Sequence, residues 1–151
     1  GIVKGWAINN AAKMLVSWGL ENFYIDAGGD IQSHGNNADG KPWNVGICNP
    51  FKQKEIVKVV YPQCAGVATS GTYVRGQHIY NPHQPDTPLQ DIVGITVLAP
   101  DVLEAHRFAT AACAMGRKGI QFGEQLADCE GYAIDADGIA TMTTGFSKYA
   151  Y

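Results

Sequence analysis

Apolar residues recur along this chain with two different periods, which separate predicted helices from predicted strands. Near the start, apolar side chains fall at helical spacing and Gly19 supplies a C-terminal stop; they are Ile8, Ala11, Ala12, Leu15 and Trp18. A second long helix is predicted to begin at Asp101, which can cap it together with Glu104 three residues later. Small residues at helical spacing indicate that this second helix packs closely; they are Val102, Ala105, Ala109, Ala112, Cys113 and Gly116.

The remaining apolar runs are shorter and predict strands. They cover residues 23–27, 43–47, 56–61, 64–69 and 93–98, and a short helix is predicted over 119–127. Residues 132–135 and 139–143 are predicted to pair as a hairpin across an Asp-Gly turn. Because strands outnumber helices and do not alternate with them, the sequence predicts an α+β fold. We expect one domain over residues 1–151, with a mixed or antiparallel sheet packed against two longer helices.

Composition narrows the function classes. The net charge of −3 gives no electrostatic reason to expect nucleic acid or an anionic membrane as a partner. No apolar run approaches the roughly 20 residues of a spanning helix. The chain begins with Gly1 inside what reads as a motif, so we expect an upstream portion. The four cysteines form no Cys-x-x-Cys pair, which disfavours zinc, and we expect each to be a buried free thiol.

A polar stretch over residues 69–82 is the strongest local signal of chemistry. Strand residues lead into Thr69-Ser70-Gly71, which present hydroxyls and backbone N–H groups suited to phosphate oxygens. An imidazole, His78, and Ile79 follow before a turn at residues 81–82. The alternative interpretation is a β-hairpin with a polar turn.

Three other positions each allow a structural and a functional interpretation. Lys4 at the start of the first helix is either solvated or reaches toward an anion held there. Gly28 and Gly29 either form a tight turn or let the backbone approach a ligand, with Asp26 and Asp30 beside them as acceptors or metal ligands.

The third position is a pair on the second helix. His106 and Thr110 are four residues apart and share the edge of its small-residue stripe. Without further context they read as a histidine and a threonine at a seam between helix and sheet.

Taken together, five segments resemble, in order, motifs of the FAD:protein FMN transferases. They are residues 1–7, 25–31, 67–71, 78–82 and 105–116. The resemblance spans nearly the whole chain and implies the α+β fold of that family. It also implies a divalent-metal-dependent enzyme that moves FMN from FAD onto a Thr or Ser hydroxyl of a target flavoprotein.

The resemblance assigns roles to particular residues. FAD would be bordered by Lys4, Ala27, Gly28, Gly29, Asp30, Thr69, Ser70, Gly71, His78 and Ile79. Mg²⁺ or another divalent metal would lie at Gly1, His106 and Thr110. Phosphoryl transfer needs charge neutralisation and a base for the incoming hydroxyl, and His78 or a carboxylate would supply the base. The family location implied is the outer face of the cell membrane, reached through a missing N-terminal segment; a cytoplasmic location is the alternative.

Departures from the family pattern leave other interpretations open. Asn9, Asn81 and His106 stand where the family usually has an acid, and Pro85 stands where a glycine is expected. His106 matters most, because an imidazole suits zinc or manganese better than magnesium. The chain reads as the C-terminal portion of a transferase domain. The alternatives are a non-catalytic FAD-binding module with a degraded metal site, and a purely structural α+β domain.

Overall fold

The computed structural model describes residues 2–52, 54–63, 65–72 and 79–150. The helices are α1 (Val3–Ser17), α2 (Val102–Ala114) and α3 (Lys118–Glu124), with a 3₁₀ turn at Phe146–Tyr149. The strands are β1 (Phe23–Ala27), β2 (Asp30–His34), β3 (Val45–Cys48), β4 (Ile56–Val60), β5 (Gly66–Gly71), β6 (Ile92–Ala99), β7 (Glu130–Asp135) and β8 (Ala140–Met142). The predicted α+β class is confirmed.

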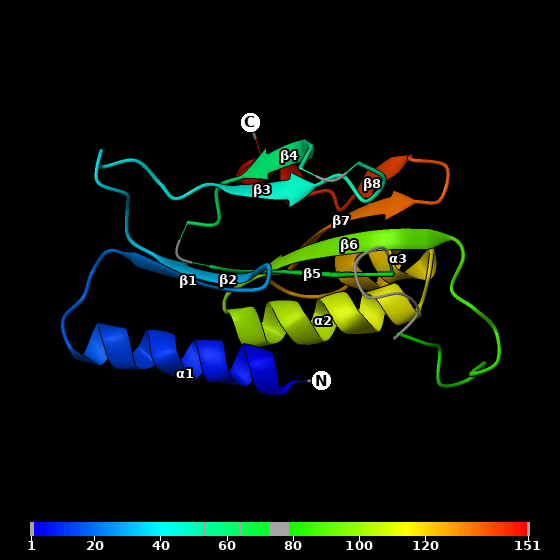
Figure 1. Cartoon of the computed structure of the whole chain (residues 1–151), viewed down its shortest axis with the longest axis horizontal. Coiled ribbons are helices and arrows are strands. Elements are labelled where there is room, and N and C mark those ends of the chain that lie inside the picture. The colour runs from blue at the N-terminus through cyan, green and yellow to red at the C-terminus, as the bar shows by residue number, and fades with distance from the viewer. Residues whose placement is uncertain (1, 53, 64, 73–78, 151) are drawn as a thin grey trace.

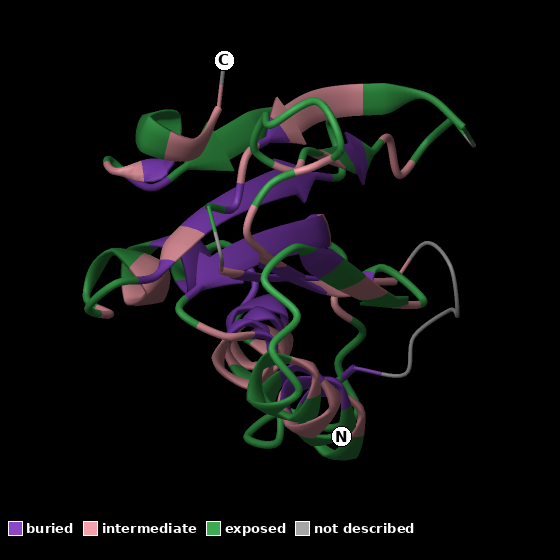
Figure 2. Cartoon of the chain, turned by 90° about the vertical axis from the view of Figure 1, so that its left-hand side faces the viewer, coloured by how far each residue is buried: buried purple, intermediate pink, exposed green. Residues whose placement is uncertain are grey.

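The fold is built in three layers, which Figure 1 shows from the side. A six-stranded antiparallel sheet, in the order β1-β2-β5-β6-β7-β8, forms the middle layer. The helices cover one face of this sheet, and the separate antiparallel hairpin β3–β4 covers the other. Residues between the layers are buried, whereas the outer surfaces of the helices and the hairpin are exposed (Figure 2).

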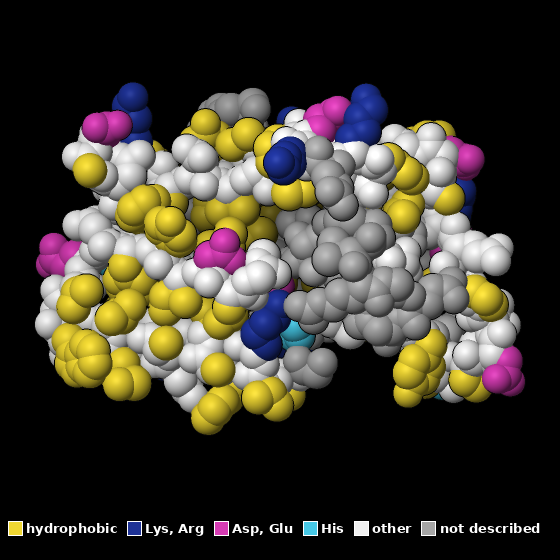
Figure 3. Space-filling model, viewed as in Figure 1, with side chains coloured by type: hydrophobic (Ala, Val, Ile, Leu, Met, Phe, Trp, Pro, Cys, Tyr) yellow, Lys and Arg dark blue, Asp and Glu magenta, His cyan; other side chains and the backbone are white. Residues whose placement is uncertain are grey.

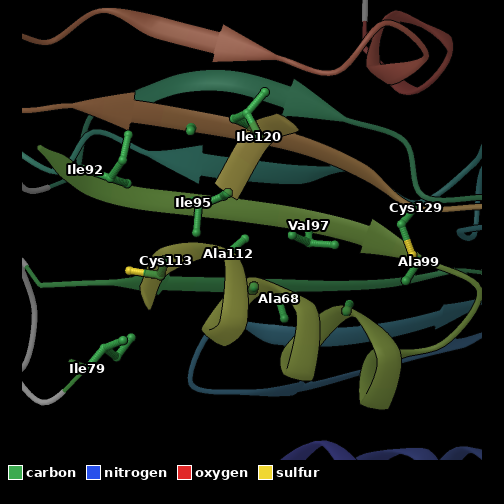
Figure 4. Packing of buried hydrophobic residues seen from close by; sticks show 13 residues of the cluster. Ala68, Ile79, Ile92, Ile95, Val97, Ala99, Ala112, Cys113, Ile120 and Cys129 are labelled. Atoms are coloured by element: carbon green, nitrogen blue, oxygen red, sulfur yellow. The ribbon is translucent and has the colours of Figure 1, made fainter. Parts of the chain in front are cut away.

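Strand alternation divides the hydrophobic core into two clusters. In β5, Ala68 belongs to the cluster on the helix side, whereas Val67 belongs to the cluster on the hairpin side. In Figure 4, Ala68, Ile95 and Ala112 lie between the strands β5 and β6 and the helix α2. The sheet therefore contributes one face to each cluster, and the small residues of α2 allow the helix to approach it closely.

Two expectations about burial are met only in part. The apolar stripe predicted for the first helix contributes Ile8 and Ala12 to its buried face, which also includes Gly5 and Asn9. Trp18 lies just past the helix end and is 66% exposed. Cys48 is exposed as well, because Ile47 takes the inward position in β3 and the next residue points outward.

Large apolar side chains are exposed on and around α1. They include Ile2, Val3, Trp6, Met14, Val16, Trp18 and Leu20. Figure 3 shows hydrophobic side chains gathered over this helix at the lower left of the molecule. None of the helices in the described ranges combines the length and the apolar composition that a membrane-spanning helix requires.

Candidate functional site

A large cavity is lined by residues from both sides of the sheet, by the start of α1 and by α2 on the helix side and by β3 on the hairpin side. Its volume is about 1170 Å³, and the strands β1, β2, β5 and β6 complete its lining. Large concave cavities with a few convergent polar groups are the usual places where small ligands bind. The lining differs between its two ends: Lys4, Asp30 and His106 bring charged and polar groups to one, and Tyr24 and Trp43 bring aromatic rings to the other.

At the polar end, two basic side chains contact the same carboxylate oxygen of Asp30. Lys4 Nζ lies 2.9 Å from Asp30 Oδ2, and His106 Nδ1 lies 2.5 Å from that atom. The Asp30 side chain is only 2% exposed, and a buried carboxylate needs such partners to offset its lost hydration. Because a carboxylate beside an ammonium only accepts hydrogen bonds, Nδ1 is the ring nitrogen that carries a hydrogen here. We refer to these three residues as the Asp30 cluster.

Three different elements supply the Asp30 cluster, and two contacts hold them in place. The first is at Gly5, where an added Cβ would lie 3.1 Å from His106 Cβ, so a side chain there would crowd α2. The second joins α2 to β2, since Gln32 Oε1 accepts a hydrogen bond of 2.8 Å from the Val102 backbone N–H. Lys4, on the first turn of α1, and His106, on the second turn of α2, therefore meet over the first residue of β2.

Hydroxyl groups continue the polar end along β5. Ser70 Oγ and Thr110 Oγ1 are 3.3 Å apart, and Thr110 Oγ1 donates to the His106 carbonyl at 3.0 Å. On the other face of the strand, the hydroxyls of Thr69 and Thr96 share a hydrogen bond of 2.8 Å. All four residues line the cavity.

The double glycine joins β1 to β2 as a tight turn. Gly28 and Gly29 have φ values of +64° and +87°, which favour glycine at both positions. Asp26 Oδ1 accepts a hydrogen bond of 2.9 Å from the Gly29 N–H and so stabilises the turn. The turn interpretation is therefore confirmed, and Gly28 and Gly29 also line the cavity.

The other end of the cavity carries an aromatic pair that the sequence analysis missed. The rings of Tyr24 and Trp43 meet edge to face, with centroids 5.0 Å apart. Trp43 Nε1 donates to the His34 carbonyl at 3.0 Å, which fixes the indole. Val45 and Ile47 of β3 extend this wall. The sequence did contain a signal for Tyr24. Side chains alternate along β1, so Tyr24 lies on the same strand face as Asp26 and on the face opposite Phe23.

The cavity brings together most of the residues predicted to border FAD. Those that line it are Lys4, Gly28, Gly29, Asp30, Thr69, Ser70, Gly71 and Ile79. Ala27 does not line it, since its neighbour Asp26 takes the cavity-facing position of β1. The predicted catalytic residue His78 and the predicted metal ligand Gly1 lie outside the described residues.

The remaining predicted metal ligands fit Mg²⁺ poorly. Magnesium requires near-octahedral oxygen ligands and usually takes one or two carboxylates from the protein. Among the described residues, the carboxylate that contacts His106 is that of Asp30, and its Oδ2 already accepts hydrogen bonds from Lys4 and His106. The Thr110 hydroxyl donates to a carbonyl, and no group of three or more His, Cys, Asp or Glu residues in the described ranges could hold a metal ion.

Comparisons with known proteins show which family the chain resembles. A sequence model of the ApbE family matches residues 1–133. The FAD:protein FMN transferase of Vibrio cholerae is 32% identical over 99% of this chain and 46% of its own length. The FAD:protein FMN transferase of Salmonella typhimurium is 29% identical over 87% of this chain and 39% of its own length.

Two solved structures share the fold. The flavin transferase ApbE from Vibrio cholerae superposes with a TM-score of 0.85 at 30% identity, covering 97% of this chain and 50% of that one. The ApbE protein from Thermotoga maritima gives a TM-score of 0.86 at 25% identity, covering 99% of this chain and 52% of that one. The chain thus spans about half the length of the relatives that it matches.

Proposed function

The chain belongs to the ApbE family, and from this membership we propose that it binds FAD and transfers FMN to a protein acceptor. The acceptor would be a Thr or Ser hydroxyl on a target flavoprotein. The curated relatives support this proposal through their names, since each of the two described above is an FAD:protein FMN transferase.

The observation that carries the proposal is the division of one cavity into two ends. Tyr24 and Trp43 at one end offer an aromatic wall suited to a planar ring system. At the other end, the ammonium of Lys4 and the hydroxyls along β5 offer donors to phosphate oxygens. FAD has both parts, with two aromatic ring systems joined through a diphosphate.

In the proposed step, the acceptor hydroxyl oxygen attacks the phosphorus on the FMN side of the diphosphate. A new P–O bond forms, the bond to the bridging oxygen breaks, and AMP leaves. The hydroxyl proton passes to a base, for which His78 is the residue proposed from its motif. Lys4 would stabilise the charge that develops on the phosphate oxygens. Because the described donors suit Mg²⁺ poorly, no step of this proposal is assigned to the metal.

The test is to incubate the chain with FAD and a Thr-bearing acceptor protein. The acceptor should gain the mass of FMN less one water, and AMP should be released in equal amount. An acceptor of unchanged mass with no AMP, at saturating FAD, would contradict transferase activity. A Thr→Ala acceptor provides the control, since it lacks the attacking oxygen.

FAD binding can be tested separately with a lysine variant. Lys4→Ala should weaken FAD binding by about 1–2 kcal/mol, the range of a charge-assisted hydrogen bond. Lys13→Ala is the matched control, because Lys13 lies on the same helix, is exposed and does not line the cavity. Titrations that follow the quenching of flavin fluorescence would measure both. Equal FAD affinities for the two variants would show that Lys4 does not contribute to FAD binding.

A second candidate function is a non-catalytic FAD-binding module. The presence of His106 in the Asp30 cluster, at the position where the resemblance expects an acidic metal ligand, favours it. The same two assays separate the candidates. A module would bind FAD with normal sensitivity to Lys4→Ala and release no AMP.

A further inference from the structure

We propose that the Asp30 cluster takes the place of a divalent cation in this protein, so that FAD binds without any metal. The inference rests on the proposed FAD binding and concerns how the cavity neutralises the diphosphate. It starts from the convergence of Lys4 and His106 on one oxygen of one buried carboxylate.

The cluster occupies the Oδ2 atom of Asp30, where a dication would otherwise coordinate. Metal coordination would have to displace the ammonium or the imidazole from Oδ2, since both lie within hydrogen-bond distance of that atom. An ammonium that stayed in place would repel the metal at close range. Displacing His106 would require its ring, whose side chain is only 14% exposed, to rotate out of the pair, or α2 to shift against the close approach at Gly5 and the Gln32–Val102 hydrogen bond.

Lys4 can serve the phosphates while it remains anchored. An ammonium has three N–H donors, and the pair with Asp30 uses one of them. The Lys4 side chain is 33% exposed and lines the cavity, so its other donors face space that a ligand can enter. Asp30 thus fixes the position of the ammonium, and Lys4 is the group that meets the diphosphate.

The first experiment measures the affinity of the full chain for FAD in excess EDTA and in millimolar Mg²⁺. The two dissociation constants should agree within about twofold. FAD binding that is lost in EDTA and restored by Mg²⁺ would overturn the inference while leaving the proposed FAD binding intact. An absence of saturable FAD binding under both conditions would contradict the proposed function itself, and this inference with it.

A second experiment reinstates a carboxylate with His106→Asp. Two carboxylates beside Lys4 repel each other and the diphosphate, and a dication relieves both repulsions. FAD affinity of this variant should fall at least about tenfold in EDTA and recover with Mg²⁺ or Mn²⁺. His106→Asn is the matched control: it keeps an N–H donor for Asp30, adds no charge and should stay independent of metal. A His106→Asp variant that remained insensitive to both metals would overturn the inference.

The third measurement starts from the wild-type chain and needs neither His106 variant. Mn²⁺ alone, followed by its paramagnetic resonance signal, should remain free when the wild-type chain is added. Stoichiometric Mn²⁺ binding that Asp30→Asn abolishes would show that Asp30 is a metal ligand, and the inference would be wrong.

Discussion

The two long helices both begin with a valine, and the two valines have opposite environments. Val3 of α1 is 70% exposed, whereas Val102 of α2 is 0% exposed. Asp101 caps α2 by accepting a hydrogen bond of 2.9 Å from the Glu104 N–H, whereas Ile2, the N-cap residue of α1, makes no side-chain cap hydrogen bond. Helix α2 is therefore fixed by the core of the sheet, whereas α1 touches the rest of the molecule through a narrow face.

The difference shows how the cavity is assembled. Helix α2 delivers His106 and Thr110 from a rigid support, since its small residues pack directly on β5 and β6. Helix α1 delivers Lys4 and is held largely by Gly5, by buried Ile8, Asn9 and Ala12, and by the ion pair with Asp30. Changes in the support of α2 should accordingly cost more stability than equivalent changes in α1, and the following experiments test this comparison.

The largest effect is expected at Gly66, where β5 passes under the start of α2. A Cβ there would lie 2.1 Å from the Val102 backbone nitrogen and 2.3 Å from the Asp101 carbonyl carbon, so backbone would have to move. Gly66→Ala should reduce the free energy of unfolding by about 3 kcal/mol, the upper range for overpacking. Urea denaturation followed by circular dichroism measures the change. Gly123→Ala is the control, since its Cβ would meet only Thr143 Cγ2 at 3.5 Å and should cost less than about 0.5 kcal/mol.

The valines allow the same substitution on both helices. Val102→Ala should lower the free energy of unfolding by about 2 kcal/mol, because it removes two fully buried methyl groups. Val3→Ala should change it by less than about 0.5 kcal/mol, because the side chain is largely in solvent and alanine favours the helix. Equal losses in the two variants would contradict the contrast between α1 and α2.

The sequence predicted the elements whose patterns are local. The Asp101 cap, the small-residue stripe of α2 and the Asp-Gly hairpin between β7 and β8 are all confirmed, because each depends on residues a few positions apart. The buried face of α1 was predicted only in part, since Ile8 and Ala12 are buried as the stripe requires. Its packing surface includes Gly5 and Asn9, which hydrophobic periodicity does not mark, and Trp18 lies past the helix end.

The site could be predicted as a set of residues but not as a geometry. Motif order singled out Lys4, Asp30 and His106 separately, yet their convergence depends on the pairing of β2 with β5 and on the angle at which α1 meets α2. Asp30 and His106 are 76 positions apart, and no local pattern encodes a contact at that range. The pair Tyr24–Trp43 was missed for the same reason, since the glycine turn, β2 and a loop separate the two rings in sequence.

Alkaline pH should lower the free energy of unfolding through Cys113, a residue of α2 that is buried against the sheet. Burial, followed by the nearby charge of Asp91, raises the pKa of this thiol from its ordinary 9.0 to about 11. Because of this raised pKa, the folded state binds the proton more tightly than the unfolded state does. The contribution of the Cys113 thiol to the free energy of unfolding is therefore complete below about pH 9 and is lost as the pH rises toward 11. Near pH 10 the loss should be about 1.4 kcal/mol.

Cys113→Ala isolates this contribution. The free energy of unfolding should fall between pH 8 and about pH 10 in both proteins, because the pKa of Cys129 is also raised to about 11. The wild type should lose about 1.4 kcal/mol more than the variant over that interval. The same loss in both proteins would mean that Cys113 does not titrate from a buried position.

The smallest effect is expected at the start of α2, where Asp101 provides the cap that α1 lacks. Asp101→Ala removes the acceptor of the Glu104 N–H and should lower the free energy of unfolding by about 1 kcal/mol. Asp101→Ser retains an oxygen that can accept this hydrogen bond, and should therefore recover most of the loss. Because the cap lies one turn before His106, the Ala variant should also loosen the Asp30 cluster, and FAD affinity should fall with stability. Thermal unfolding and FAD titration of the three proteins measure both effects. If Asp101→Ser were as unstable as Asp101→Ala, the hydrogen bond would not be the source of the stability, and the contrast between the two helices would rest on packing alone.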